Sequence, residues 1–229
     1  MRYSLVFTLV FIVISNLAHS QSLDLSIIDN QLIVNNSSTY QLEYLPAEDF
    51  QELDWQAGYA YYLDGSSRKF NGMKYDPELD RIQVDAEGNV LTLLPGVING
   101  VSMETDKSIT RIFVKVPLEK PVFMEALSVG KIHLLIYRKV KDDGLDYYQQ
   151  MDATKITIDK QASTAPVEYD EFIYTWSIEG VKKFKSSKKA ILALMKDYKD
   201  EVETFLENEG IKTKEMPDLM KLFDYYNGL

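Results

Sequence analysis

The chain has 229 residues, with 25 Lys and Arg against 35 Asp and Glu, and it contains no cysteine. A net charge of −10 repels phosphate backbones and argues against nucleic acid as a partner. The absence of cysteine excludes disulfides, thiolate nucleophiles, zinc–thiolate sites and the lipid-bearing cysteine of bacterial lipoproteins. A chain of this length can bury enough apolar surface to form one domain without such cross-links.

The first twenty residues have the pattern of a removable export signal. Arg2 precedes an apolar run over residues 5–14, and a polar step leads to the small-residue pattern Ala18-His19-Ser20. We expect cleavage before Gln21. The run is shorter than the roughly 20 residues of a membrane span, and no later stretch is apolar enough for one, so we expect no transmembrane helix in the mature chain. The sequence predicts an exported protein that is periplasmic, cell-surface or extracellular.

From Leu23 to about Lys185 the chain consists of short runs of β-branched and aromatic residues separated by turn signals. Their spacing of roughly 8–12 residues is typical of antiparallel sheets, and residues 85–89 and 142–144 suit hairpin turns. We therefore predict a meander, a curved sheet or a sandwich. The runs are LDLSIIDNQLIVNN (23–36), AGYAYYLDG (57–65), RKFNGMKYD (68–76), DRIQVDAEG (80–88), NVLTLLPG (89–96), ITRIFVKVP (109–117), KIHLLIYRKV (131–140), TKITID (154–159) and EFIYTWSIEG (171–180).

After Lys185 the apolar period changes from 2 to 3.6, which predicts one helix from near Ser187 to Gly210. A second helix has Pro217 in its first turn. The sequence therefore predicts an α+β fold, with a β-rich region over 21–185 and a helical pair over 186–229 packed on the sheet in one structural domain. The apolar stripes are Ile191, Leu194, Met195, Tyr198, Val202, Phe205 and Leu206 in the first helix, and Leu219, Leu222, Phe223 and Tyr226 in the second.

This layout resembles that of a family of exported bacterial proteins with no assigned chemistry. The resemblance rests on the signal, the strand-rich middle with the hairpin KFNGMKYDPELDRIQV, and the Lys-rich tail SKKAILALMKDYKDEVETFLEN followed by LMKLFDYYN. It covers most of the mature chain. It implies export and this fold class, and it supplies no catalytic residue.

Patterns for histidine catalysis and for metal binding are incomplete. His133 is the one histidine outside the signal, so no His-based triad or multi-His site can be built, and its place in an apolar strand favours a structural role. Asp76 with Glu87 at the twelfth position imitates a calcium loop, but Arg81 stands where that loop needs glycine. We expect hairpin turns here and around Gly144. We predict no metal, no cofactor and no catalytic residue.

Two further enzyme patterns carry little weight. Ser186 and Lys189 form Ser-x-x-Lys, but the other motifs of penicillin-recognising enzymes are missing, so we expect a helix cap followed by solvated lysines. The acidic composition leaves open a carboxylate-dependent hydrolase acting on envelope glycans or peptides, because only a structure can show two acids facing each other across a cleft.

Five lysines form a basic cluster at the start of the first predicted helix: Lys182, Lys183, Lys185, Lys188 and Lys189. The helix dipole disfavours cations at that end, so the cluster is a candidate contact with an anionic surface such as lipid headgroups, phosphorylated glycans or an acidic protein segment. The commoner alternative is that these lysines pair with carboxylates of the sheet or solvate a linker.

Tyr59 and Tyr61 share one face of a predicted strand and form a second candidate surface, with Tyr62 on the opposite face. On an exposed face they could stack on sugars or on a protein partner; the commoner alternative is that they fill the boundary between sheet and helices. We predict an exported, non-enzymatic binding or interaction protein of the bacterial cell envelope. Its expected partner is another envelope protein or an anionic surface, and the hydrolase is the alternative.

Overall fold

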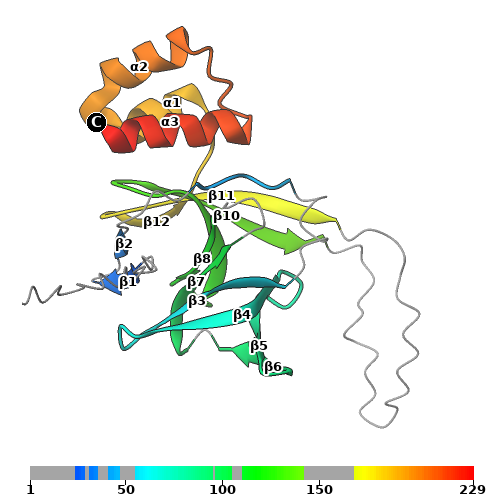
Figure 1. Ribbon diagram of the computed structural model, residues 1–229. Helices are drawn as coiled ribbons and strands as arrows, with labels where there is room; N and C mark the ends of the chain where they lie inside the picture. Colours follow the sequence, from blue (N-terminus) through cyan, green and yellow to red (C-terminus); the bar gives the residue numbers. More distant parts are fainter. Residues whose placement is uncertain are drawn as a thin grey trace, which may run out of the picture.

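The computed structural model describes residues 24–28, 31–35, 41–46, 55–94, 96–104, 110–141 and 168–229. These residues form an α+β fold with a ten-stranded antiparallel sheet, a separate two-stranded sheet and three α-helices near the C-terminus (Figure 1). The predicted fold class is therefore confirmed. The predicted signal at 1–20, the predicted strand at 154–159 and the acids around Gly144 lie outside the described residues.

The large sheet has the strand order β12-β11-β10-β9-β8-β7-β3-β4-β5-β6. Two meanders, β3 to β6 and β7 to β12, therefore join where β7 pairs with β3. The small sheet is the hairpin of β1 (Asp24–Ile28) and β2 (Gln31–Asn35). The strands of the large sheet are β3 (Gln56–Tyr62), β4 (Ser67–Asp76), β5 (Arg81–Ala86), β6 (Asn89–Leu93), β7 (Ile98–Glu104), β8 (Thr110–Val116), β9 (Val122–Ser128), β10 (His133–Val140), β11 (Tyr169–Ser177) and β12 (Gly180–Lys183).

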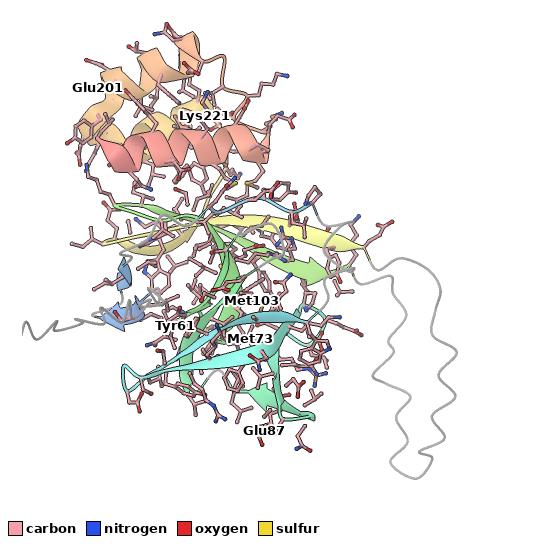
Figure 2. All side chains as sticks on the ribbon, in the orientation of Figure 1. Tyr61, Met73, Glu87, Met103, Glu201 and Lys221 are labelled. Atoms are coloured by element: carbon pink, nitrogen blue, oxygen red, sulfur yellow. The ribbon has the colours of Figure 1, made fainter. Side chains whose placement is uncertain are left out.

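The sheet is strongly curved, so that β3 to β6 bend over β7, β8 and β9 (Figure 1). Met73 of β4 and Met103 of β7 lie inside this curve, in a core that extends to β8 and β9 (Figure 2). Gly100 of β7 permits a close approach, because a Cβ there would lie 2.3 Å from the carbonyl oxygen of Phe113.

Asp80, in the turn between β4 and β5, ties the curved part of the sheet to β9. Its carboxylate accepts hydrogen bonds from the Phe123 backbone N–H at 3.1 Å and from the Tyr75 hydroxyl at 2.9 Å. The regular pairing of β9 with β10 ends at Glu125. The Phe123 N–H lies beyond this pairing, and the Asp80 carboxylate serves as its acceptor. Burial raises the pKa of Asp80, although both hydrogen bonds act in the opposite direction.

The helices are α1 (Lys188–Leu194), α2 (Lys199–Asn208) and α3 (Met216–Gly228). The prediction of one helix from Ser187 to Gly210 is wrong, because the chain breaks at Met195 and forms a 3₁₀ turn over Lys196–Tyr198. The break folds α2 back, so that both halves of the predicted stripe face a common core; a straight helix of that length would extend for about 33 Å. The predicted end at Gly210 agrees with its φ of +62°.

The helical unit packs on one end of the large sheet, with α3 nearest to β9 and β10 (Figure 1). Leu134 and Ile136 of β10 share a core with Leu222 and Phe223 of α3. Asn227 also fixes this contact, because its side-chain amide accepts from the Ile132 N–H and donates to the Ile132 carbonyl. The helices therefore pack on the sheet.

A buried chain of alternating charges crosses four adjacent strands. Glu125 of β9 accepts from Arg111 of β8 at 2.7 Å and from Arg138 of β10, and Arg138 also donates to Glu171 of β11 at 2.9 Å. Arg111, Glu125 and Arg138 are each at most 3% exposed. Tyr44 donates to Glu171 at 2.7 Å. Burial by itself would raise the pKa of Glu125, but Arg111 and Arg138 outweigh it and hold that pKa below its usual range.

We predict that Glu125→Gln lowers the free energy of unfolding by about 3–5 kcal/mol, because it leaves two buried guanidinium groups opposite a neutral amide. Urea unfolding followed by circular dichroism measures the loss. Glu168→Gln is the matched control, since Glu168 pairs with Lys141 at the exposed surface and should contribute little. Equal midpoints for the two variants would contradict the role of the buried charges.

The effect of Glu125→Gln on the free energy of unfolding should depend on pH. Because the folded-state pKa of Glu125 is lowered, the stability that it contributes is present above the ordinary carboxylate range and is lost as the pH falls through the folded pKa. The difference in unfolding free energy between the wild type and Glu125→Gln should therefore be largest near neutral pH and should shrink in acid. A constant difference would contradict ionic stabilisation.

Candidate functional site

The candidate site lies at the start of α1, where two of the five predicted lysines are found. Ser187 caps the helix, and its hydroxyl accepts from the Ala190 N–H at 3.3 Å. The cap is therefore Ser187, and not Ser186 of the Ser-x-x-Lys pattern. Lys188 and Lys189 occupy the first turn, which contains no acidic residue to balance the helix dipole.

Acidic residues of α2 neutralise Lys188. Its ammonium group lies 2.8 Å from Glu203 and 3.0 Å from Glu207. These hydrogen bonds raise the pKa of Lys188, and the same contact lowers the pKa of Glu203. The break after α1 makes the contact possible, because Lys188 and Glu203 would be about 22 Å apart along a straight helix. Lys188 thus links α1 to α2.

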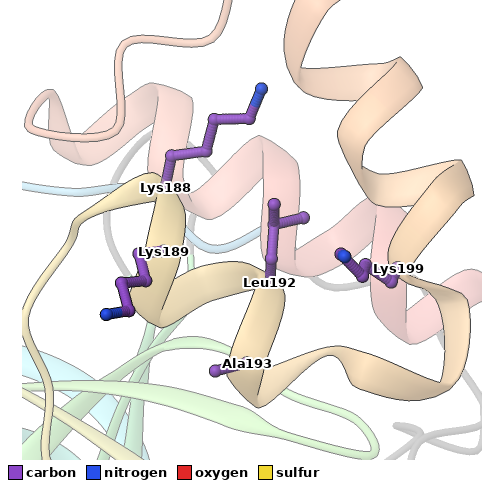
Figure 3. Close-up of a pocket in the computed structure, with 5 residues that line it drawn as sticks. All are labelled: Lys188, Lys189, Leu192, Ala193 and Lys199. Atoms are coloured by element: carbon purple, nitrogen blue, oxygen red, sulfur yellow. The ribbon is translucent and has the colours of Figure 1, made fainter.

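A shallow hollow of about 550 Å³ lies between α1 and the start of α2 (Figure 3). Lys188, Lys189 and Lys199 line it together with Leu192 and Ala193. Lys199 extends from the first residue of α2 towards Leu192, as Figure 3 shows. In the part of the chain that the structure describes, no carboxylate lies within 4 Å of the ammonium groups of Lys189 or Lys199. The hollow therefore combines two cations with an apolar floor.

The other three predicted lysines lie outside this hollow. Lys182, on the edge strand β12, pairs with Glu179 at 2.6 Å. Lys183 places its ammonium 4.0 Å from the centre of the Phe172 ring, a cation–π contact. Lys185 is exposed in the segment before α1. The predicted basic cluster is thus divided, and Lys188 and Lys189 are the members that share a surface with Lys199.

The tyrosines of β3 are placed mainly in the core. Tyr61 is 2% exposed, and its hydroxyl lies 2.8 Å from that of Ser102 in a buried hydrogen bond. Tyr59 is half-buried beside the same core, and Tyr62 packs against the core on the opposite face. The predicted alternation is therefore observed, but Tyr61 offers no exposed ring on which a sugar or a partner could stack.

The remaining candidates have structural surroundings. His133 is 6% exposed, accepts weakly from the Gly130 N–H at 3.4 Å and meets the ring of Trp176 edge-on. Asp76 accepts from the backbone of its own turn and from Arg81 at 2.9 Å, as expected for a hairpin turn. Within the described ranges, no group of three or more His, Asp or Glu side chains is placed to hold a metal ion.

No family model, curated protein or solved structure matches the chain. None of the helices in the described part of the chain has the length and apolar character needed to cross a membrane.

We predict that Lys188→Met loosens α1 by removing its link to Glu203 and Glu207, while the methionine keeps the apolar stem of the lysine. Hydrogen exchange measured by mass spectrometry should show several-fold faster exchange of the α1 amides. Lys189→Met is the matched control, because it changes the neighbouring lysine without removing that link. Equal exchange in the two variants would show that Lys188 does not hold α1 to α2.

Proposed function

We propose that this chain is an exported, non-enzymatic binding protein of the bacterial cell envelope, and that the hollow between α1 and α2 binds an anionic group of another envelope component. The observation that carries this proposal is that Lys189 and Lys199 line one hollow together with Leu192 and Ala193. These two cations come from different helices, and the helix break at Met195 places both helices around the hollow.

The composition of the hollow indicates the chemistry of the ligand. Ammonium groups attract phosphate or carboxylate, and an apolar floor suits a ligand whose charge is attached to an apolar body. Lys188 is already neutralised by Glu203 and Glu207, so the attraction depends on Lys189 and Lys199. A lipid headgroup, a phosphorylated glycan and an acidic protein segment all have this shared anionic character.

Because the whole chain is acidic, an anionic partner should bind only where the hollow faces it. A net charge of −10 repels an anionic surface from most directions. At physiological ionic strength, screening limits the range of this repulsion to about 8 Å, so nearby lysines dominate once the hollow faces the surface. The export signal expected at residues 1–20 supports an encounter with envelope components.

We predict that the double variant Lys189→Glu and Lys199→Glu loses association with isolated cell envelopes. Lysines near an anionic surface contribute about 1 kcal/mol each, so binding should weaken by at least about 30-fold. The measurement is co-sedimentation with envelope membranes at low and at high salt. Lys188 stays unchanged, because its replacement would loosen α1.

The control is the double variant Lys120→Glu and Lys139→Glu, which changes the net charge equally at two exposed positions, one between β8 and β9 and one on β10. It should bind like the wild type apart from a small general electrostatic effect. Equal losses in both double variants would assign the association to net charge, and unchanged binding in both would refute the lysine-lined hollow.

A further inference from the structure

The edge strand β6 exposes apolar side chains that nothing in the described part of the chain covers. Val90 is 57% exposed, Leu91 is 51% exposed, and Leu94, just beyond the strand, is 61% exposed. β6 ends the large sheet and pairs on one side only, with β5. Exposed apolar edge strands of this kind readily pair with another strand.

The β5–β6 hairpin determines which backbone groups of β6 face outward. Its two-residue turn consists of Glu87 and Gly88, both with positive φ, as in a type I′ turn. Ala86 and Asn89 flank that turn and form a hydrogen-bonded pair, so Leu91 and Leu93 also bond towards β5. The N–H and C=O groups of Val90 and Thr92 then point to the open edge. The Leu94 carbonyl is occupied, because it accepts from the Val97 N–H.

The two edges of the sheet differ in charge. The opposite edge strand, β12, has only four residues and presents Lys182 and Lys183, which disfavour strand addition. By contrast, residues 88–103 contain no Asp, Glu, Lys or Arg, although 26% of the chain is charged. Two acidic copies of the chain repel each other over most of their surface, but this edge brings no like charges together.

We propose that β6 pairs antiparallel with β6 of a second copy of this chain, with Leu91 on the two-fold axis. In this register Val90 of each copy lies opposite Thr92 of the other copy. Each of these two pairs forms two backbone hydrogen bonds, N–H to C=O in both directions. The four outward groups on each strand are then satisfied. A register centred on Thr92 would instead require the occupied Leu94 carbonyl.

The register also covers the exposed part of Leu91 at the edge of the core. Leu91 lies opposite Val84, and Leu93 lies opposite Ile82, whose side chains are fully buried in the curved part of the sheet. Leu91 therefore extends a core face to the open edge, where half of its side chain meets solvent. Leu91 of the second copy would sit directly against it and remove this apolar surface from water.

The absence of native cysteine permits a direct test of the register. In the purified protein, Leu91→Cys should form a disulfide-linked dimer under mild oxidation, because Cα atoms of a non-hydrogen-bonded pair lie about 4.5 Å apart. Val90→Cys is the register control, since the two copies of residue 90 would be too far apart to bridge. Ile178→Cys, 83% exposed in the turn before β12, controls for random collision.

A covalent dimer for Leu91→Cys alone would support the proposal. Equal cross-linking at Val90 or Ile178, or no cross-linking at Leu91, would overturn it. Light scattering of the wild type should also give twice the chain mass, and Thr92→Pro should halve that mass, because proline removes an outward N–H and leaves the bonds to β5 intact. A wild type that remains monomeric, even if it captures an added extended peptide, would contradict pairing with a second copy.

Discussion

The position of Glu125 between Arg111 and Arg138 is the constraint on which the rest of the structure depends. Residues 123, 125 and 127 of β9 share one face of the sheet, so this charge lies between the core inside the curve and the core beneath the helices. A shift of β9 by one residue would turn Glu125 into the apolar face that holds Met124 and Ala126. The buried charges therefore specify how four strands align.

This alignment positions the surfaces that carry the functional proposals. Next to the buried charges, Leu134 and Ile136 lie on the same face of the sheet. The helices bury their apolar residues against these two side chains. α1 and α2 must then fold back on each other, which joins Lys188 to Glu203 and places Lys199 in the hollow lined by α1. At the far edge of the sheet, β6 is the last strand and has an open side.

Much of the fold could be predicted from alternation and periodicity, but the interruptions could not. Ile112, Val114 and Val116 do share one buried face, as their spacing indicates. β9 was missed because a charged residue stands in the middle of it, and β7 because Gly100 interrupts it. The break between α1 and α2 was hidden because the apolar stripe continues through it. Lys199 was therefore missed as well, since only the break places it in the same hollow as Lys189.

The claim that the lysine-lined hollow meets an envelope component can be tested by site-specific photocross-linking in living cells. A photoreactive amino acid would replace Ala193, which is exposed in the lining of the hollow, and in a second strain Leu79, which is 46% exposed in the β4–β5 turn. We expect a discrete adduct from position 193 that position 79 does not give. The same adducts from both positions, or an adduct from position 79 alone, would contradict the assignment of the binding site to the helical unit.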